Sequence, residues 1–146
     1  MKKILVAERS ESLCLLFKDE LSDEGYDVVT LTRPEDLIET IRQEKPDLLL
    51  MDAEMGKQGI WSLLQGMRKS GYRLPIILST TYSVSKGLPE ALVDYIFVKS
   101  SNLNALKVNI GTILEYKGEP VLPERVLFER EKERRSPVQM IMPFQN

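Results

Sequence analysis

One carboxylate stands where a buried strand should end, and it is the first candidate for chemistry in this chain. Residues 46–52 read Pro-Asp-Leu-Leu-Leu-Met-Asp, in which an apolar run follows Pro46 and Asp47 and closes on Asp52. An apolar run without alternation is typical of a strand that is buried on both faces of a parallel sheet. In such sheets the ligand crevice lies beyond the carboxyl ends of the strands, so the sequence predicts Asp52 at the mouth of a cleft. The alternative is that Asp52 only caps the turn that follows it.

Other charged and hydroxyl-bearing residues follow the neighbouring apolar runs. Glu8 and Arg9 come directly after the first run, Thr80 ends the fourth, and Lys99 follows the fifth. Carboxyl ends of parallel strands meet at one edge of a sheet, so these side chains should gather there. The predicted cleft therefore collects two carboxylates, a hydroxyl group and two cations.

The elements that must position these residues are short apolar runs alternating with amphipathic stretches. Strands are predicted at residues 4–7, 26–31, 48–51, 74–79 and 95–98. Helices are predicted at 10–24, 32–45, 59–70, 83–93 and 103–116, the fourth interrupted by Gly87 and Pro89, with Leu16 and Leu63 among the inward residues. This alternation indicates an α/β fold with a doubly wound, five-stranded parallel sheet between two layers of helices. We expect the flavodoxin-like strand order 2-1-3-4-5, which puts the ends of the first and third strands side by side.

Composition excludes several kinds of site. The chain has 146 residues, 42% of them hydrophobic, with a net charge of −2, as in an ordinary globular domain. It has no histidine and one cysteine, Cys14, which excludes Cys/His zinc sites, an internal disulfide and histidine general-base catalysis. Cys14 stands among leucines and should be a buried, inert thiol. The first apolar stretch stops at Glu8, too short for a signal peptide or a spanning helix, so we expect a cytoplasmic protein without a membrane partner.

Four pieces of the chain resemble one family. They are Lys3-Ile-Leu-Val-Ala-Glu8, residues 46–52 followed by Met55, residues 74–80 (Leu-Pro-Ile-Ile-Leu-Ser-Thr) and residues 94–99 (Asp-Tyr-Ile-Phe-Val-Lys). No single piece is specific, but together, in this order and spacing, they resemble the receiver domain of two-component response regulators over residues 1–116. The resemblance implies a signalling module rather than an enzyme, with at most self-phosphorylation and dephosphorylation at Asp52. It implies a histidine kinase or another signalling protein as partner.

The resemblance gives three candidates a role. Asp52 matches the phosphoacceptor, a carboxylate nucleophile that takes a phosphoryl group from a kinase phosphohistidine. Thr80 matches the hydroxyl that hydrogen-bonds the phosphoryl group, and Lys99 matches the lysine that pairs with a phosphoryl oxygen. From the residues alone, the alternatives are an ordinary strand-end hydroxyl for Thr80 and a solvated surface charge for Lys99, and the position of Lys99 directly after Phe97-Val98 favours the site interpretation.

The acidic pocket departs from the family pattern at Arg9. Family members usually carry two acidic residues here, which hold Mg²⁺ together with the phosphoacceptor. This chain has Glu8 and Arg9, so that the two carboxylates with Arg9 and Lys99 sum to a net charge of 0. Only Glu8 and Asp52 remain as ligands, which makes the implied magnesium site weak or absent. We expect the Arg9 guanidinium to bond Asp52 instead; the alternative is that Arg9 points to solvent and Glu8 recruits a weak metal ion.

A second departure lies at the switch position, three residues before Lys99. The family commonly has an aromatic residue there that rotates on activation. This chain has Ile96 at that position, and Tyr95 is one place earlier.

The C-terminal extension, residues 117–146, lies beyond the resemblance. It carries a run of alternating charges at 129–135, with apolar groups on either side at 126–128 and 138–144. Two strands joined by a charged turn and a docking segment both fit this pattern, whereas a disordered tail needs fewer apolar groups. The extension lacks a helix-turn-helix pattern and is too short for a usual DNA-binding domain, so no nucleic-acid partner is expected. We predict a homodimer through this extension.

Two functions stay open at this stage. The first is a stand-alone atypical receiver, or pseudo-receiver, that acts through protein–protein interaction, either never phosphorylated or competent with an unusual metal site. The second is a small flavodoxin-like enzyme or cofactor-binding protein that uses the same crevice. Flavin sites of that kind have a Ser/Thr/Gly-rich phosphate loop after the first strand. Residues 8–11 read Glu-Arg-Ser-Glu, which is a charged segment without glycine.

Overall fold

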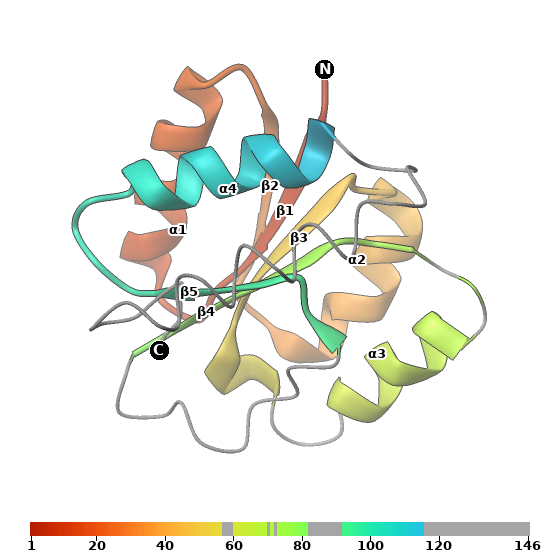
Figure 1. Ribbon diagram of the computed structural model, residues 1–146. Coiled ribbons are helices and arrows are strands. Elements are labelled where there is room, and N and C mark those ends of the chain that lie inside the picture. The colour runs from red at the N-terminus through yellow and green to blue at the C-terminus, as the bar shows by residue number, and fades with distance from the viewer. Residues whose placement is uncertain (57–59, 70, 72, 82–91, 116–146) are drawn as a thin grey trace, which may run out of the picture. The chain divides into compact units, whose positions relative to one another are not determined.

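A computed structural model of the chain describes residues 1–56, 60–69, 71, 73–81 and 92–115 (Figure 1). Most of the predicted fourth helix, and the C-terminal extension at 117–146, lie outside the described residues. The chain divides into two compact units, which meet between Ile76 and Ile77 and are described in turn.

Five strands form one parallel sheet in the order β2-β1-β3-β4-β5, which confirms the predicted topology. The strands are β1 (Lys3–Ala7), β2 (Asp27–Leu31), β3 (Leu48–Asp52), β4 (Ile76–Thr80) and β5 (Tyr95–Val98). Ala7 lies in register with Leu31 on one side and with Met51 on the other. The residues that follow Ala7 and Met51, Glu8 and Asp52, therefore lie at the same edge of the sheet.

Helices flank the strands of the first unit on both faces. The helices of the chain are α1 (Glu11–Asp23), α2 (Leu37–Glu44), α3 (Ile60–Lys69) and α4 (Asn104–Glu115), with short 3₁₀ turns η1 (Pro34–Asp36) and η2 (Ala53–Gly56). Within the first unit, Figure 1 shows α1 on one side of β1–β3, and α2 and α3 on the other. Within the described residues, no helix is long and apolar enough to cross a membrane.

Helix α1 begins immediately after the candidate residues of β1. Ser10 is its N-cap, as its side chain accepts a hydrogen bond from the Leu13 backbone N–H at 3.2 Å. Beyond the helix, Gly25 has a φ of 96°, a left-handed conformation that suits glycine best. The cap holds residues 8–10 in a short, fixed connection between β1 and α1.

The apolar stripes of α1 and α3 are narrower than predicted. The inward residues of α1 are Cys14, Phe17 and Leu21, spaced three and four apart on one face. Leu16 and Leu63 were expected to face inward, but their exposed fractions are 38% and 52%. Their neighbours Phe17 and Leu64 already occupy the core-facing positions, so these two leucines are left on the surface.

Candidate functional site

Asp52 is the last residue of β3 and is almost fully buried, with 1% of its surface exposed. Its Oδ1 atom accepts a hydrogen bond from the Glu54 backbone N–H at 3.1 Å, where the chain turns into η2. This is the turn-capping role expected of a strand-ending aspartate. Asp52 therefore caps the turn and also presents its second carboxylate oxygen toward the end of β1.

Arg9 binds that second oxygen. Its Nε donates to Asp52 Oδ2 at 2.9 Å, which is the contact expected from the sequence. Among the described residues Nε is its only hydrogen-bonding donor atom, so the contact is a single hydrogen bond. The hydrogen bond to Asp52 is the main reason that the pKa of Arg9 is raised above its ordinary value. The partners differ in burial, since the side chain of Arg9 is 55% exposed and that of Asp52 only 1%.

Glu8 is the second buried carboxylate, with 2% of its surface exposed. Its Oε2 accepts a hydrogen bond from the Ser10 backbone N–H at 3.1 Å, and its own backbone N–H donates to the Leu31 carbonyl at 2.9 Å. The side chain is thus turned toward the start of α1. Its negative charge and that of Glu54 both add to the raised pKa of Arg9, so the guanidinium lies in an acidic surrounding.

The carboxylate oxygens at this site fit a magnesium ion poorly. Mg²⁺ requires several hard oxygen ligands in near-octahedral geometry. Both oxygens of Asp52 and one of Glu8 already accept hydrogen bonds from N–H donors, and one of those donors is a permanent cation. In the described part of the chain, no three acidic or sulfur- or imidazole-bearing side chains form a group suited to a metal ion. The weak or absent metal site at Glu8 and Asp52 stays a prediction.

The second unit brings Thr80 and Lys99 together. Thr80 ends β4 and is in register with Val98, and the Lys99 backbone N–H donates to the Thr80 carbonyl at 2.7 Å. Thr80 is 2% exposed, and its Oγ1 donates to the Thr81 carbonyl at 2.9 Å. Lys99 is half-buried. The two residues lie at the ends of neighbouring strands, as the sequence predicted.

The switch position holds Ile96, which is buried, and Tyr95 is buried as well. In β5 these two residues pair in register with Leu78 and Ile77, respectively. Successive residues of a strand point to opposite faces of the sheet. Tyr95 therefore points to the other face of the sheet, away from the side that Ile96 occupies.

Sequence reasoning did not identify the two backbone donors at the site. The backbone N–H groups of Glu54 and Ser10 bind the carboxylates of Asp52 and Glu8, in each case two residues further along. An acidic side chain that bonds a backbone N–H two residues on is a recurrent turn, and this spacing was the signal available. The Ser79 hydroxyl, next to Thr80 in β4, is buried and has no hydrogen-bond partner among the described residues.

Cys14 should be a slow thiol, as its neighbours predict. It is 5% exposed, its Sγ donates to the Glu8 carbonyl at 3.3 Å, and burial raises its pKa. Because the thiolate is the reactive form, a raised pKa moves reactivity to higher pH. We expect Ellman's reagent at pH 8 to react at least about tenfold more slowly with the native chain than with the urea-unfolded chain. Equal rates would contradict the burial, and Cys14→Ser gives the background.

Comparisons with known proteins show the family to which the fold belongs. A family model described as the response regulator receiver domain matches residues 4–110. The chain is 32% identical over 117 residues to the probable transcriptional regulator ycf27 of Porphyridium aerugineum, covering 77% of this chain and 48% of that protein. It is 33% identical over 79 residues to the alkaline phosphatase synthesis transcriptional regulatory protein PhoP of Bacillus subtilis, covering 54% of this chain and 33% of that protein. The chain thus spans half or less of the length of these curated relatives.

A solved structure gives the same assignment. The response regulator protein TrrA from Thermotoga maritima, in complex with Mg²⁺–BeF, superimposes with a TM-score of 0.69 at 31% identity. The match covers 77% of this chain and 99% of that chain.

Proposed function

The chain belongs to the response regulator receiver domain family, and from this premise we propose that it is an atypical receiver with Asp52 as its candidate phosphoacceptor. It would act in two-component signalling through contacts with other proteins. The observation that carries the proposal is the hydrogen bond from Arg9 Nε to Asp52 Oδ2 at 2.9 Å, at the position where the family usually has an acid. No observation on the described residues favours the flavin or small-enzyme alternative.

The Arg9 contact disfavours phosphorylation for a physical reason. A carboxylate nucleophile needs one oxygen free to attack phosphorus in line with the leaving group. In Asp52 one oxygen is bound by the Glu54 N–H and the other by Arg9, whose charge also lowers the nucleophilicity of the carboxylate. The pair must open before attack, while the buried carboxylate has little water to replace the guanidinium. We therefore propose that the unphosphorylated form with Arg9 on Asp52 is the working state.

The remaining roles and partners are part of this proposal. Thr80 and Lys99 match the family's phosphoryl-contact residues and are the groups that would hold a phosphoryl group if Asp52 received one. TrrA has been solved in complex with the histidine kinase ThkA. We assign a histidine kinase or a similar signalling protein as the partner of this chain, and we retain the cytoplasmic location and the homodimer through residues 117–146 as proposals.

Labelling by acetyl phosphate tests the proposal. We expect intact-mass measurement to find slow phosphorylation of the parent chain, with the same rate in Mg²⁺ and in EDTA, because Arg9 occupies the place of the metal. Asp52→Asn gives the background, and Lys99→Met tests the phosphoryl-contact role. Rapid, magnesium-dependent labelling of the parent at Asp52 would instead make the chain a competent receiver whose Arg9 swings away from the site.

A further inference from the structure

Strand β2 stands at one end of the strand order, so only one of its edges pairs with a neighbouring strand, β1 (Figure 1). The Asp27 N–H donates to the Lys2 carbonyl at 2.9 Å, which shows that Asp27 turns its backbone groups toward β1. The N–H and C=O groups of one residue in a parallel strand point to the same side, and successive residues point to opposite sides. Val28 and Thr30 therefore turn theirs outward. None of these four backbone groups has a hydrogen-bond partner among the described residues.

The outer edge of β2 lacks the features that usually protect such an edge. Proteins commonly block an outer strand with charged side chains, proline or a β-bulge. Residues 28–31 read Val-Val-Thr-Leu, without charge or proline, and β2 stays in register with β1 over all five of its residues. Val29, Thr30 and Leu31 are half-exposed. In the part of the chain that the structure describes, this edge is thus suited to pairing with one more strand.

One segment of the C-terminal extension has the length and composition of such a strand. Residues 138–142 read Val-Gln-Met-Ile-Met, and Pro137 and Pro143 stand directly on either side. Proline is tolerated at the ends of strands and in edge strands, so the two prolines limit the segment to five residues, as many as β2 has. The segment has no charge, and its alternation gives each face of a strand at least one large apolar side chain. The other apolar stretch, at 126–128, has only three residues between charged ones.

We propose that residues 138–142 of one copy of this chain add as a strand to the outer edge of β2 of a second copy. The inference rests on the homodimer proposed through residues 117–146, and it names the surface that receives the extension. The backbone groups of the added strand pair with those of Val28 and Thr30, and its apolar side chains extend both faces of the sheet.

The length of the extension permits this exchange between copies. Helix α4 ends at Glu115, and the 22 residues from 116 to 137 span at most about 75 Å when extended. A five-stranded sheet is only about 20 Å wide. Each copy gives its segment and receives the segment of the other, so the association closes at two chains.

Two full-length variants block the two sides of the proposed contact. Thr30→Pro, the edge-blocked variant, removes an outward N–H of β2 and no hydrogen bond to β1. Met140→Pro with Ile141→Pro, the segment-blocked variant, removes an N–H that faces β2 in either register, because successive N–H groups point to opposite sides. The matched controls are Thr30→Val, which keeps the N–H, and Lys132→Pro with Glu133→Pro, in the charged run. Thermal melts check that each variant is folded.

Sedimentation of these variants, alone and mixed, tests which surfaces meet. We expect a dimer for the parent and for both controls, and a dimer weakened at least about tenfold for each blocked variant. Mixed at equal concentration, the two blocked variants should associate with each other, because one keeps the edge and the other keeps the segment. Folded blocked variants that dimerise like the parent, or that fail to associate when mixed, overturn the proposal.

Amide exchange in β2 tests the contact residue by residue. We expect the Val28 and Thr30 amides to exchange at least about tenfold more slowly in the parent than in the segment-blocked variant. The Val29 and Leu31 amides face β1 and are the internal control, which should not change. A dimeric parent with equal exchange of Val28 and Thr30 in both chains overturns this inference and leaves the homodimer standing. A monomeric parent overturns both.

Discussion

Replacing Arg9 by Asp is expected to give this chain a magnesium-dependent phosphorylation that the parent lacks. Arg9→Asp removes the cation from Asp52 Oδ2 and supplies a third carboxylate beside Glu8 and Asp52. Three buried or half-buried carboxylates repel one another, and a divalent cation relieves that repulsion. We expect acetyl-phosphate labelling at Asp52 to be faster by on the order of tenfold or more, a change equivalent to about 1.4 kcal/mol in the barrier.

Two controls separate loss of the arginine from gain of the acid. Arg9→Gln removes the cation without adding a ligand, so it should speed labelling less than Arg9→Asp and should not add a dependence on Mg²⁺. Arg9→Asp with Asp52→Asn should remain unlabelled. Magnesium binding itself is measured by calorimetry. Equal labelling of the parent and Arg9→Asp in Mg²⁺ would show that Arg9 is not the obstacle.

Truncation after Gly118 is expected to abolish stable dimerisation and to leave the receiver folded. The matched family region ends at residue 110, and α4 ends at Glu115, so the described fold is complete without the extension. The extension contains large apolar side chains, among them Leu127, Phe128, Met140, Ile141 and Phe144. Burying each of them is worth roughly 1.5–3 kcal/mol, so their removal should weaken association by more than about a hundredfold.

High salt is the right condition for this measurement, because it screens attraction between exposed charges and leaves the burial of apolar side chains to hold a dimer together. Sedimentation should then find a dimer for the full chain and a monomer for the truncated one, with the same melting temperature. A full-length chain with Phe128→Ser and Phe144→Ser should behave like the truncated one. A monomeric full-length chain whose tail amides exchange freely would refute the prediction.

Much of the fold could be predicted from the sequence because its signals are local. The run 48–52 and the strand at 95–98 are continuous apolar segments, and each lies in the predicted place. The alternation of strands with helices predicts parallel strands, and the crossovers between parallel strands are right-handed. The same local reasoning places Asp52, Thr80 and Lys99 at strand ends.

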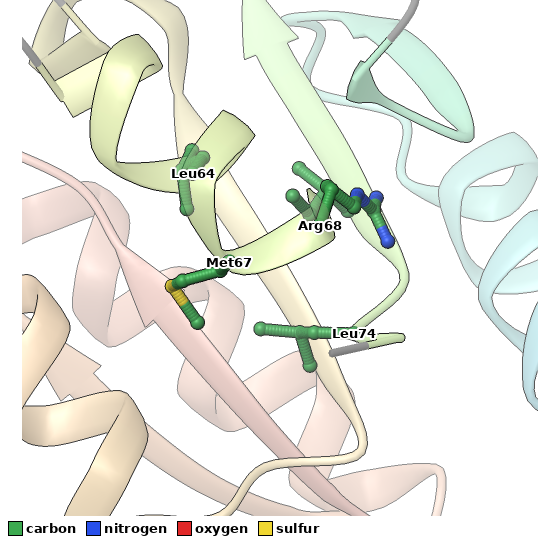
Figure 2. Close-up of a pocket in the computed structure, with 5 residues that line it drawn as sticks. Leu64, Met67, Arg68 and Leu74 are labelled. Carbon is green, nitrogen blue, oxygen red and sulfur yellow. The ribbon is translucent and has the colours of Figure 1, made fainter. Parts of the chain in front are cut away.

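Surface exposure was predicted less well. Leu16 and Leu63 have the helical spacing of core residues, but only the middle of each apolar stripe is buried. The spacing of apolar residues says which face of a helix turns inward, but the width of the buried stripe depends on what packs against it. The same limit explains why the small hollow beside α3 has no signature in the sequence, because it is lined by Leu64 of α3 and by Leu74 of the segment before β4 (Figure 2).

The sequence by itself determined the order of the strands, the acid at the end of β3 and the presence of an arginine where the family carries an acid. Only the tertiary structure decided what that arginine does. Arg9 and Asp52 are 43 positions apart, and the register of β1 with β3 brings them within hydrogen-bonding distance. By its charge alone, Glu8 could also have been the partner of Arg9, but its carboxylate accepts a hydrogen bond from the Ser10 N–H at the start of α1. The charge of each side chain is known from the sequence. Which of two nearby carboxylates Arg9 binds depends on the directions in which the folded backbone orients the side chains.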